Sequence, residues 1–298
     1  MLSWIEVEQH PSVKPHLTPN LHGFSEGQFY AGLNEIDPEG SMGFEEWMMA
    51  LRDRLSATHI HDPCYTFDRI VRDGCGRLLW HKMHTLDRLP AAYQNFASWF
   101  REHHLYGQTN AIVSFNWDLL AERTLTDARA GWLYTIESPL VPILKPHGSI
   151  NWSNHVERNL AAESPAWQPI APRSTYYYIR HDPFSDPFEN GTNQFLRKLI
   201  LPGDPEDAGG ARLIWTEAEA AIHERDVVVF IGYSLPRYDS FSTKFFQRVT
   251  AGKQIEVYAR SAETLQHYRQ MLPDISTTEP LSFAQSQYAR PFAEAVNA

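Results

Sequence analysis

The pattern of apolar and polar residues changes character at about residue 108. From there onward, short apolar runs alternate with segments whose apolar residues recur every three or four positions. The first pattern predicts buried strands and the second predicts amphipathic helices. Their alternation predicts an α/β fold, a parallel sheet covered by helices on both faces. The expected strands lie within residues 111–115, 139–144, 226–231 and 253–260, and the expected helices at 119–125, 211–226, 240–250 and 262–272.

The chain before residue 108 has a helical pattern. Near its start, Phe44, Trp47, Met48 and Leu51 fall on one face of a predicted helix. A second helical zone follows and is interrupted by Pro90. We expect one domain over residues 1–298, with a small helical insertion at 44–106, the sheet-containing core at 108–298 and, within it, a long loop with one short strand at 153–190.

Composition narrows the class of protein. The 298 residues are 43% hydrophobic and 21% charged, which is typical of a folded chain and not of a disordered one. The net charge of −10 argues against strong direct nucleic-acid or membrane-surface binding. The N-terminus does not resemble a secretory signal, and no apolar run reaches the roughly 18 residues that span a bilayer. We therefore expect a cytoplasmic protein.

The first of three polar corners follows the strand expected at residues 111–115. It has the sequence FNWD, and it places Asn116 and Asp118 where a parallel sheet binds its ligands, at the carboxyl ends of the strands. The alternative is structural, because an Asp in this position commonly caps the helix that follows.

The second corner, KPHGSINW, places His147 at the end of the next strand. An unperturbed histidine titrates near pH 6.5, which suits a general base, and the adjacent Gly148 permits close approach of a ligand to the backbone. The alternative is a half-buried structural histidine.

The third corner, IGYSLPRYD, places Gly232 and Ser234 after the most strand-like run in the chain. Glycine lets a ligand approach the backbone, and the Ser234 hydroxyl suits a phosphate or a ribose. The alternative is a plain turn in which a serine or Asp239 caps the next helix.

Taken together and in this order, the three motifs resemble the SIR2 superfamily, more closely its bacterial antiphage-defence members than its protein deacylases. The resemblance covers residues 44–270. It implies a Rossmann-like NAD-binding fold and chemistry at the nicotinamide–ribose bond, with NAD as substrate and no metal. It further implies His147 as the base toward a ribose hydroxyl, with Asn116 and Asp118 beside the nicotinamide ribose. The residues expected to bind the cofactor are Gly148, Gly232, Tyr233, Ser234 and Arg237.

The chain departs from the family pattern in two ways. Its two cysteines, Cys64 and Cys75, cannot supply the four zinc ligands typical of the deacylases, which favours NAD hydrolysis. The glycine-rich strand and loop that bind the pyrophosphate have no clear counterpart, and residues 73–76 are a poor one. Either the chain starts downstream of that strand or the loop is degenerate. The pyrophosphate would then need cations near the strand ends, for which Lys145, Arg237, Lys253 and Arg260 are candidates.

Two functions remain open on these grounds. The first is a defence-type NAD hydrolase that releases nicotinamide and ADP-ribose. The second is a degenerate SIR2-like scaffold, or a subunit that senses NAD or ADP-ribose without catalysis. The resemblance also implies a homo-oligomer, with a HerA-type ATPase or an Argonaute-type protein as a possible partner. A deacylase is the least favoured alternative.

Overall fold

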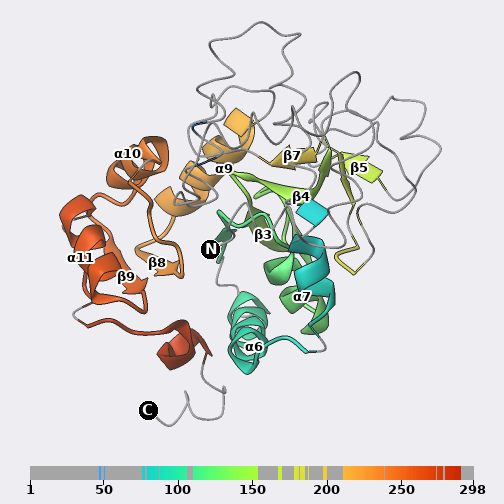
Figure 1. Cartoon of the computed structure of the whole chain (residues 1–298), viewed down its shortest axis with the longest axis horizontal. Helices are drawn as coiled ribbons and strands as arrows, with labels where there is room; N and C mark the ends of the chain where they lie inside the picture. The colour runs from blue at the N-terminus through green and yellow to red at the C-terminus, as the bar shows by residue number, and fades with distance from the viewer. Residues whose placement is uncertain are drawn as a thin grey trace, which may run out of the picture.

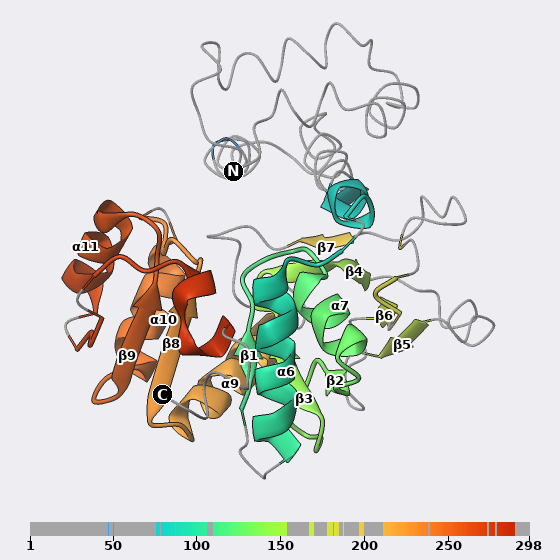
Figure 2. The ribbon, with the colours of Figure 1, turned by 90° about the horizontal axis from the view of Figure 1, so that it is seen from below.

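A mixed α/β architecture is seen in the computed structural model of the chain (Figure 1). Figure 2 gives the view from below, in which α6 runs alongside β1. Within the described part of the chain, no helix has the length and apolar character to cross a bilayer. The structure describes residues 47, 50, 76–77, 79–86, 88–105, 110–153, 167–169, 178–180, 182–184, 187, 197–199, 211–237, 239–272, 274–277 and 279–289.

Two parallel sheets form the centre of the described structure. In the first, β3 lies between β1 and β2, with Ile112 opposite Ile143 and Trp132 opposite Val141. In the second, β8 and β9 pair along five residues each. Valine, isoleucine and phenylalanine dominate β8, as expected for a strand inside a packed sheet. The strand bounds are β1 Ile112–Val113, β2 Trp132–Leu133, β3 Val141–Leu144, β8 Val227–Ile231 and β9 Gln254–Tyr258.

Helices flank these sheets, and several begin at a side-chain cap. Asp239 caps α10 by accepting a hydrogen bond from the Ser242 backbone N–H, and Ser261 caps α11 in the same way through Thr264. In Figure 1, α10 and α11 lie beside β8 and β9, and α9 lies between the two sheets. The bounds are α6 Ala91–Leu105, α7 Leu120–Asp127, α9 Ala211–His223, α10 Ser240–Val249 and α11 Ala262–Met271, followed by the short 3-10 helices η1 Phe283–Gln285 and η2 Gln287–Ala289.

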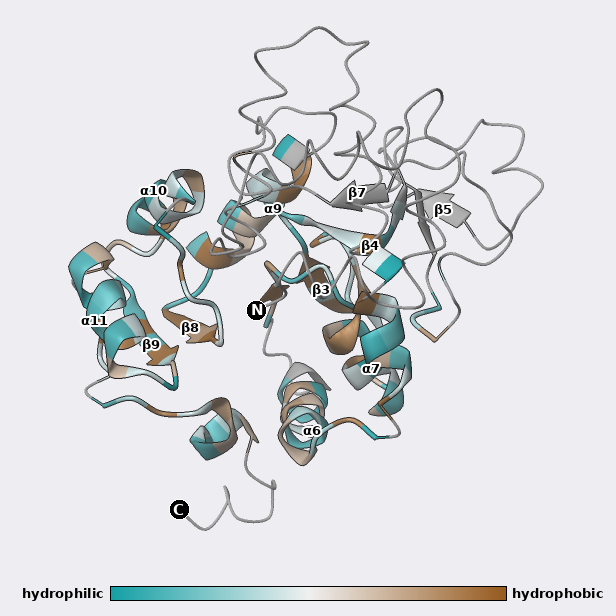
Figure 3. Ribbon diagram, viewed as in Figure 1, coloured by the Kyte–Doolittle hydropathy of each residue, from teal (hydrophilic) through white to brown (hydrophobic). Residues whose placement is uncertain are grey.

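One hydrophobic core joins the two sheets. Buried side chains from both of them, including Ile143 of β3, Phe230 of β8 and Val257 of β9, belong to one cluster with Trp215 of α9. Figure 3 shows apolar residues concentrated on these strands, with polar residues on the outer sides of the helices. Burying these side chains supplies most of the driving force that holds the two sheets together.

A third, antiparallel sheet lies next to the first and differs from expectation. Its strands are β4 Gly148–Ser153, β5 Trp167–Pro169, β6 Tyr178–Arg180 and β7 Arg197–Leu199, in the order β5-β6-β4-β7. The second polar corner was expected to end at residue 152 as a loop, but its residues continue directly into β4. The loop expected at 153–190 contains two strands and not one. These strands are three residues long, and pairing with distant residues, not a local period, defines them.

The other sequence predictions can be compared element by element. The α/β class and the four expected strands and four helices after residue 108 are confirmed. The strand β2 was not predicted, because two residues carry no period. The expected single parallel sheet is two sheets in the described residues. Much of the helical insertion expected at 44–106 lies outside the described residues, but Trp47 and Ala50 are helical. Helix α6 packs on α7 and η2 and contributes Ala97 and Phe100 to the shared core.

Candidate functional site

The structure brings the second and third corners together through His147. Its Nε2 lies 3.4 Å from Oδ2 of Asp239, the residue that caps α10. His147 is 6% exposed and Asp239 is 1% exposed, so water screens this pair weakly. A buried carboxylate beside an imidazole stabilises the protonated ring, which is the form that a general base acquires during proton transfer.

The same carboxylate also binds Tyr233. The Tyr233 hydroxyl donates to Oδ2 of Asp239 at 3.0 Å, while Oδ1 accepts from the Ser242 backbone N–H at 3.0 Å. Burial, reinforced by the negative charge of Asp239, raises the pKa of Tyr233 far above its ordinary value, so the hydroxyl keeps its proton. Asp239 is therefore held by two donors, with His147 as its third neighbour.

Aromatic rings from the first corner complete the packing around His147. The Phe115 ring stacks on Tyr233 with centroids 4.5 Å apart and meets His147 edge-on at 4.8 Å. Trp215 of α9 lies 6.2 Å from His147 and 5.7 Å from Phe115. All three corners thus converge, as the sequence predicts for residues at the carboxyl ends of parallel strands.

Asn116 and Asp118 have different environments in this arrangement. Asn116 is exposed. Asp118 accepts a hydrogen bond through Oδ1 from the backbone N–H of Leu120, the first residue of α7, at 2.9 Å. The bond gives Asp118 a structural role in the turn before α7, but not the predicted cap, because Leu119 is the N-cap of α7 and has no side-chain cap. Its pKa is raised by burial, and nearby Lys145 and the Leu120 hydrogen bond only partly oppose that effect.

Lys145 does not serve as a phosphate ligand, because it is fully buried among protein partners. Its Nζ donates to Oε1 of Glu122 at 3.0 Å, to the Ser149 hydroxyl at 2.8 Å and to the backbone carbonyl of Asp118. Oε1 of Glu122 also accepts from the Tyr134 hydroxyl at 2.7 Å. We call Lys145, Glu122, Tyr134 and Ser149 the buried network. It joins the two corners, because Lys145 of the second corner donates to the backbone carbonyl of Asp118 in the first.

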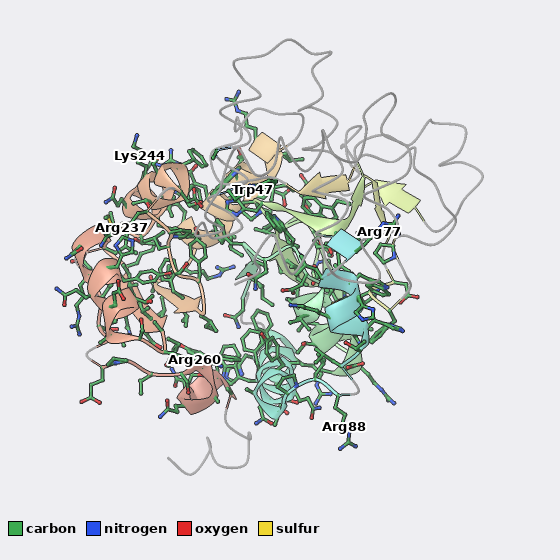
Figure 4. All side chains as sticks on the ribbon, viewed as in Figure 1. Trp47, Arg77, Arg88, Arg237, Lys244 and Arg260 are labelled. Atoms are coloured by element: carbon green, nitrogen blue, oxygen red, sulfur yellow. The ribbon has the colours of Figure 1, made fainter. Side chains whose placement is uncertain are left out.

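The remaining predicted cations are distributed unevenly. Lys253 precedes β9. Its Nζ donates to the backbone carbonyls of His223, the last residue of α9, and of Arg225. It therefore lies at the opposite edge of the sheet from the three corners. Arg237 and Arg260 are exposed residues after β8 and β9 and remain available to an anion. In Figure 4, Arg237 lies at the left edge of the molecule and Arg260 lies lower, toward the bottom.

Two of the glycines expected to bind the cofactor have a positive φ. Gly148 has φ +80° and closes a turn by donating to the Lys145 carbonyl at 2.9 Å. Gly232 has φ +67°, a conformation that favours glycine, with open space where a Cβ would lie. Ser234 is exposed. Of the alternative phosphate loop at 73–76, Gly76 is helical and residues 73–75 lie outside the described part.

An apolar cavity of about 320 Å³ separates the two parallel sheets. Val113 of β1 and Val229 of β8 face it, and Phe96 and Trp99 of α6 contribute to its wall. In the described residues β1 pairs only with β3, and β8 pairs only with β9. The cavity therefore lies where a single parallel sheet would be continuous.

Sequence reasoning missed the second role of Asp239. It gave this residue only as a possible helix cap, and the cap is present, but the other carboxylate oxygen contacts His147. The one available signal was an acidic residue seven positions after Gly232, at the end of the third corner.

Among the described residues, no group of three or more His, Cys, Asp or Glu side chains could hold a metal ion. No protein-family model matches the chain, and no curated protein is detectably similar to it.

Proposed function

We propose that the chain is a SIR2-like NAD hydrolase with a Rossmann-like core, which converts NAD and water to nicotinamide and ADP-ribose. The observation that carries the proposal is the His147–Asp239 pair, 3.4 Å apart and buried at the carboxyl ends of the strands. In the reaction the bond from the ribose C1′ to the nicotinamide nitrogen breaks, and a bond from C1′ to a water oxygen forms. The electron pair leaves with nicotinamide, and the water proton is lost to a base.

His147 has the chemistry that this reaction requires. Its imidazole takes a proton from a ribose hydroxyl or from the attacking water, and Asp239 stabilises the resulting positive charge. Asn116, exposed at the neighbouring corner, supplies an amide to orient a ribose hydroxyl or the water. Asp118 contributes by fixing the start of α7, because its carboxylate already accepts the Leu120 N–H.

The test is nicotinamide release from NAD by the purified full chain, followed by chromatography. We expect His147→Ala to reduce the rate by roughly 10²-fold or more, the usual contribution of a general base. His223→Ala is the matched control, because the His223 side chain is 57% exposed at the far end of α9. Equal rates for wild type and His147→Ala would overturn the proposal.

A second function is favoured by one observation. The apolar cavity lies between β1 and β8, and the glycine-rich strand and loop expected for this family have no counterpart among the described residues. A chain built in this way could bind ADP-ribose or NAD as a sensor or scaffold, without turnover. Calorimetry distinguishes the two: ADP-ribose binding with no nicotinamide release supports the sensor, and release that depends on His147 supports the hydrolase.

We also propose, on the resemblance alone, a cytoplasmic chain that assembles as a homo-oligomer in antiphage defence, with a HerA-type ATPase or an Argonaute-type protein as partner.

A further inference from the structure

A second hollow of the surface lies between α9 and α10, next to the His147 site. Its volume is about 600 Å³, which lies within the range of sites that bind small molecules. The groove is lined from α9 by Arg212, Trp215, Thr216 and Glu219, and from α10 by Ser240, Phe241, Lys244, Phe245 and Arg248.

The groove is cationic although the whole chain carries a net charge of −10. Three of its residues are basic and one is acidic. Arg248 pairs with Glu219 at 3.1 Å, which neutralises one of the three positive charges. Arg212 and Lys244 are both exposed, and neither has an ionic partner within the described part of the chain. Among the described residues, two cations without an ionic partner therefore face one groove.

The carboxylate of Asp239, next to the groove, already has protein partners. Asp239 immediately precedes Ser240 of the groove, but its carboxylate is buried and bound by His147, Tyr233 and the Ser242 N–H. The positive end of the α10 dipole lies at the same place and adds to the field of the two cations. The groove is thus a local exception to the acidic surface, suited to an anion.

The groove and the His147 site share a wall. Trp215 lines the groove, and its ring is 6.2 Å from the ring of His147. Trp215 is 7% exposed, and its ring contacts those of Phe241 and Phe245, with centroids 4.6 Å and 4.8 Å away. A ligand that reached from His147 past Trp215 would place its next group beside Lys244 and Arg212.

We infer that this groove holds the diphosphate of a dinucleotide or of ADP-ribose whose ribose lies at His147. In NAD a single ribose separates the reacting C1′ carbon from the diphosphate, so the two groups need adjacent sites of different character. The His147 site is buried, while the groove is open and cationic. The inference rests on the proposed ligand, but not on its cleavage.

The experiment is calorimetric titration of the full chain with ADP-ribose, with inorganic pyrophosphate and with adenosine. We expect Arg212→Gln combined with Lys244→Gln to weaken ADP-ribose and pyrophosphate binding at least tenfold, because two charge-assisted contacts with the diphosphate are lost. Arg88→Gln is the control, because Arg88 is exposed and lies at the opposite end of the molecule from Lys244 (Figure 4).

A second double variant, Arg237→Gln with Arg260→Gln, tests the competing cations after β8 and β9. Unchanged ADP-ribose affinity in the Arg212/Lys244 variant, or a larger loss in the Arg237/Arg260 variant, would overturn the inference. So would a wild-type chain that binds neither ADP-ribose nor pyrophosphate. Failure of the hydrolase proposal shows separately, as absence of nicotinamide release by a chain whose ADP-ribose binding still depends on Arg212 and Lys244.

Discussion

Lys145 of the buried network and His147 of the His147–Asp239 pair lie two residues apart in the second corner but have different surroundings. Lys145 has no exposed surface, and its amine has three protein acceptors. His147, two residues later, contacts a carboxylate beside a surface groove. The turn closed by Gly148 separates them. Lys145 thereby holds the corner in place from within the protein, while His147 pairs with Asp239.

This difference explains why residue type alone is a poor guide to function here. Lysine is a common phosphate ligand, yet Lys145 is fully buried among protein acceptors. A buried ion pair specifies geometry at a high desolvation cost, and its value depends on both partners being present. The His147–Asp239 pair is also buried, but it borders a surface groove through Trp215.

The largest expected effect comes from breaking the buried network. Lys145→Ala leaves the Glu122 carboxylate buried without its cation, so we expect a loss of about 3–5 kcal/mol in the free energy of unfolding. Urea denaturation measures it. The double variant Lys145→Met with Glu122→Leu removes both charges and should recover most of the loss. A Lys145→Ala chain as stable as wild type would show that the pair is not coupled.

A smaller effect, on chemistry instead of stability, is expected for Asp239→Asn. Asparagine caps helices as well as aspartate, so α10 should persist and the unfolding free energy should change by less than about 1 kcal/mol. The charge beside His147 is lost, and the rate of nicotinamide release should fall about tenfold or more.

The contrasting result for Asp239→Asn would be a large loss of stability with an unchanged rate of nicotinamide release. That outcome would make Asp239 a structural residue only, like those of the buried network. Ser261→Ala is a suitable reference, because it removes a cap of similar geometry from α11, away from His147.

The smallest effect is expected from Asp118→Asn and depends on pH. Burial raises the pKa of Asp118 in the folded chain above its unfolded value, so the folded state binds the proton more tightly. Its stabilising contribution is complete below the unfolded pKa and is lost as the pH rises through the folded pKa. At pH 7 the charged carboxylate therefore lowers the stability of the folded chain. Asp118→Asn should accordingly raise the melting temperature by about 2–4 °C.

At pH 3, where Asp118 is protonated in both states, the same substitution should leave the melting temperature unchanged. The asparagine carbonyl can still accept a hydrogen bond from the Leu120 N–H, so the substitution removes the charge and keeps this hydrogen bond. Scanning calorimetry at both pH values decides the matter, and equal shifts at pH 3 and pH 7 would contradict this account.

Local pattern was enough to locate the elements that carry the site. The run Val227–Ile231 and the periodic apolar positions of α10 and α11 report burial directly, because a strand or helix with one buried face must repeat its apolar residues. The same reasoning placed His147 and Gly232 at strand ends, and the structure brings their corners together. The short strands β2 and β5 escaped prediction because pairing with distant residues defines them.

The sequence by itself determined the α/β class, the order of four strands and four helices after residue 108 and the three polar corners, since these depend on local periodicity and turn residues. Only the tertiary structure decided the roles of the charged residues. Lys145 is paired inside the protein, Asp239 reaches a histidine 92 positions earlier in the chain, and Arg212 and Lys244 share a groove. The physical reason is that the pKa, hydration and partners of a charge are set by what packs around it in space, and neighbours in the chain do not fix that.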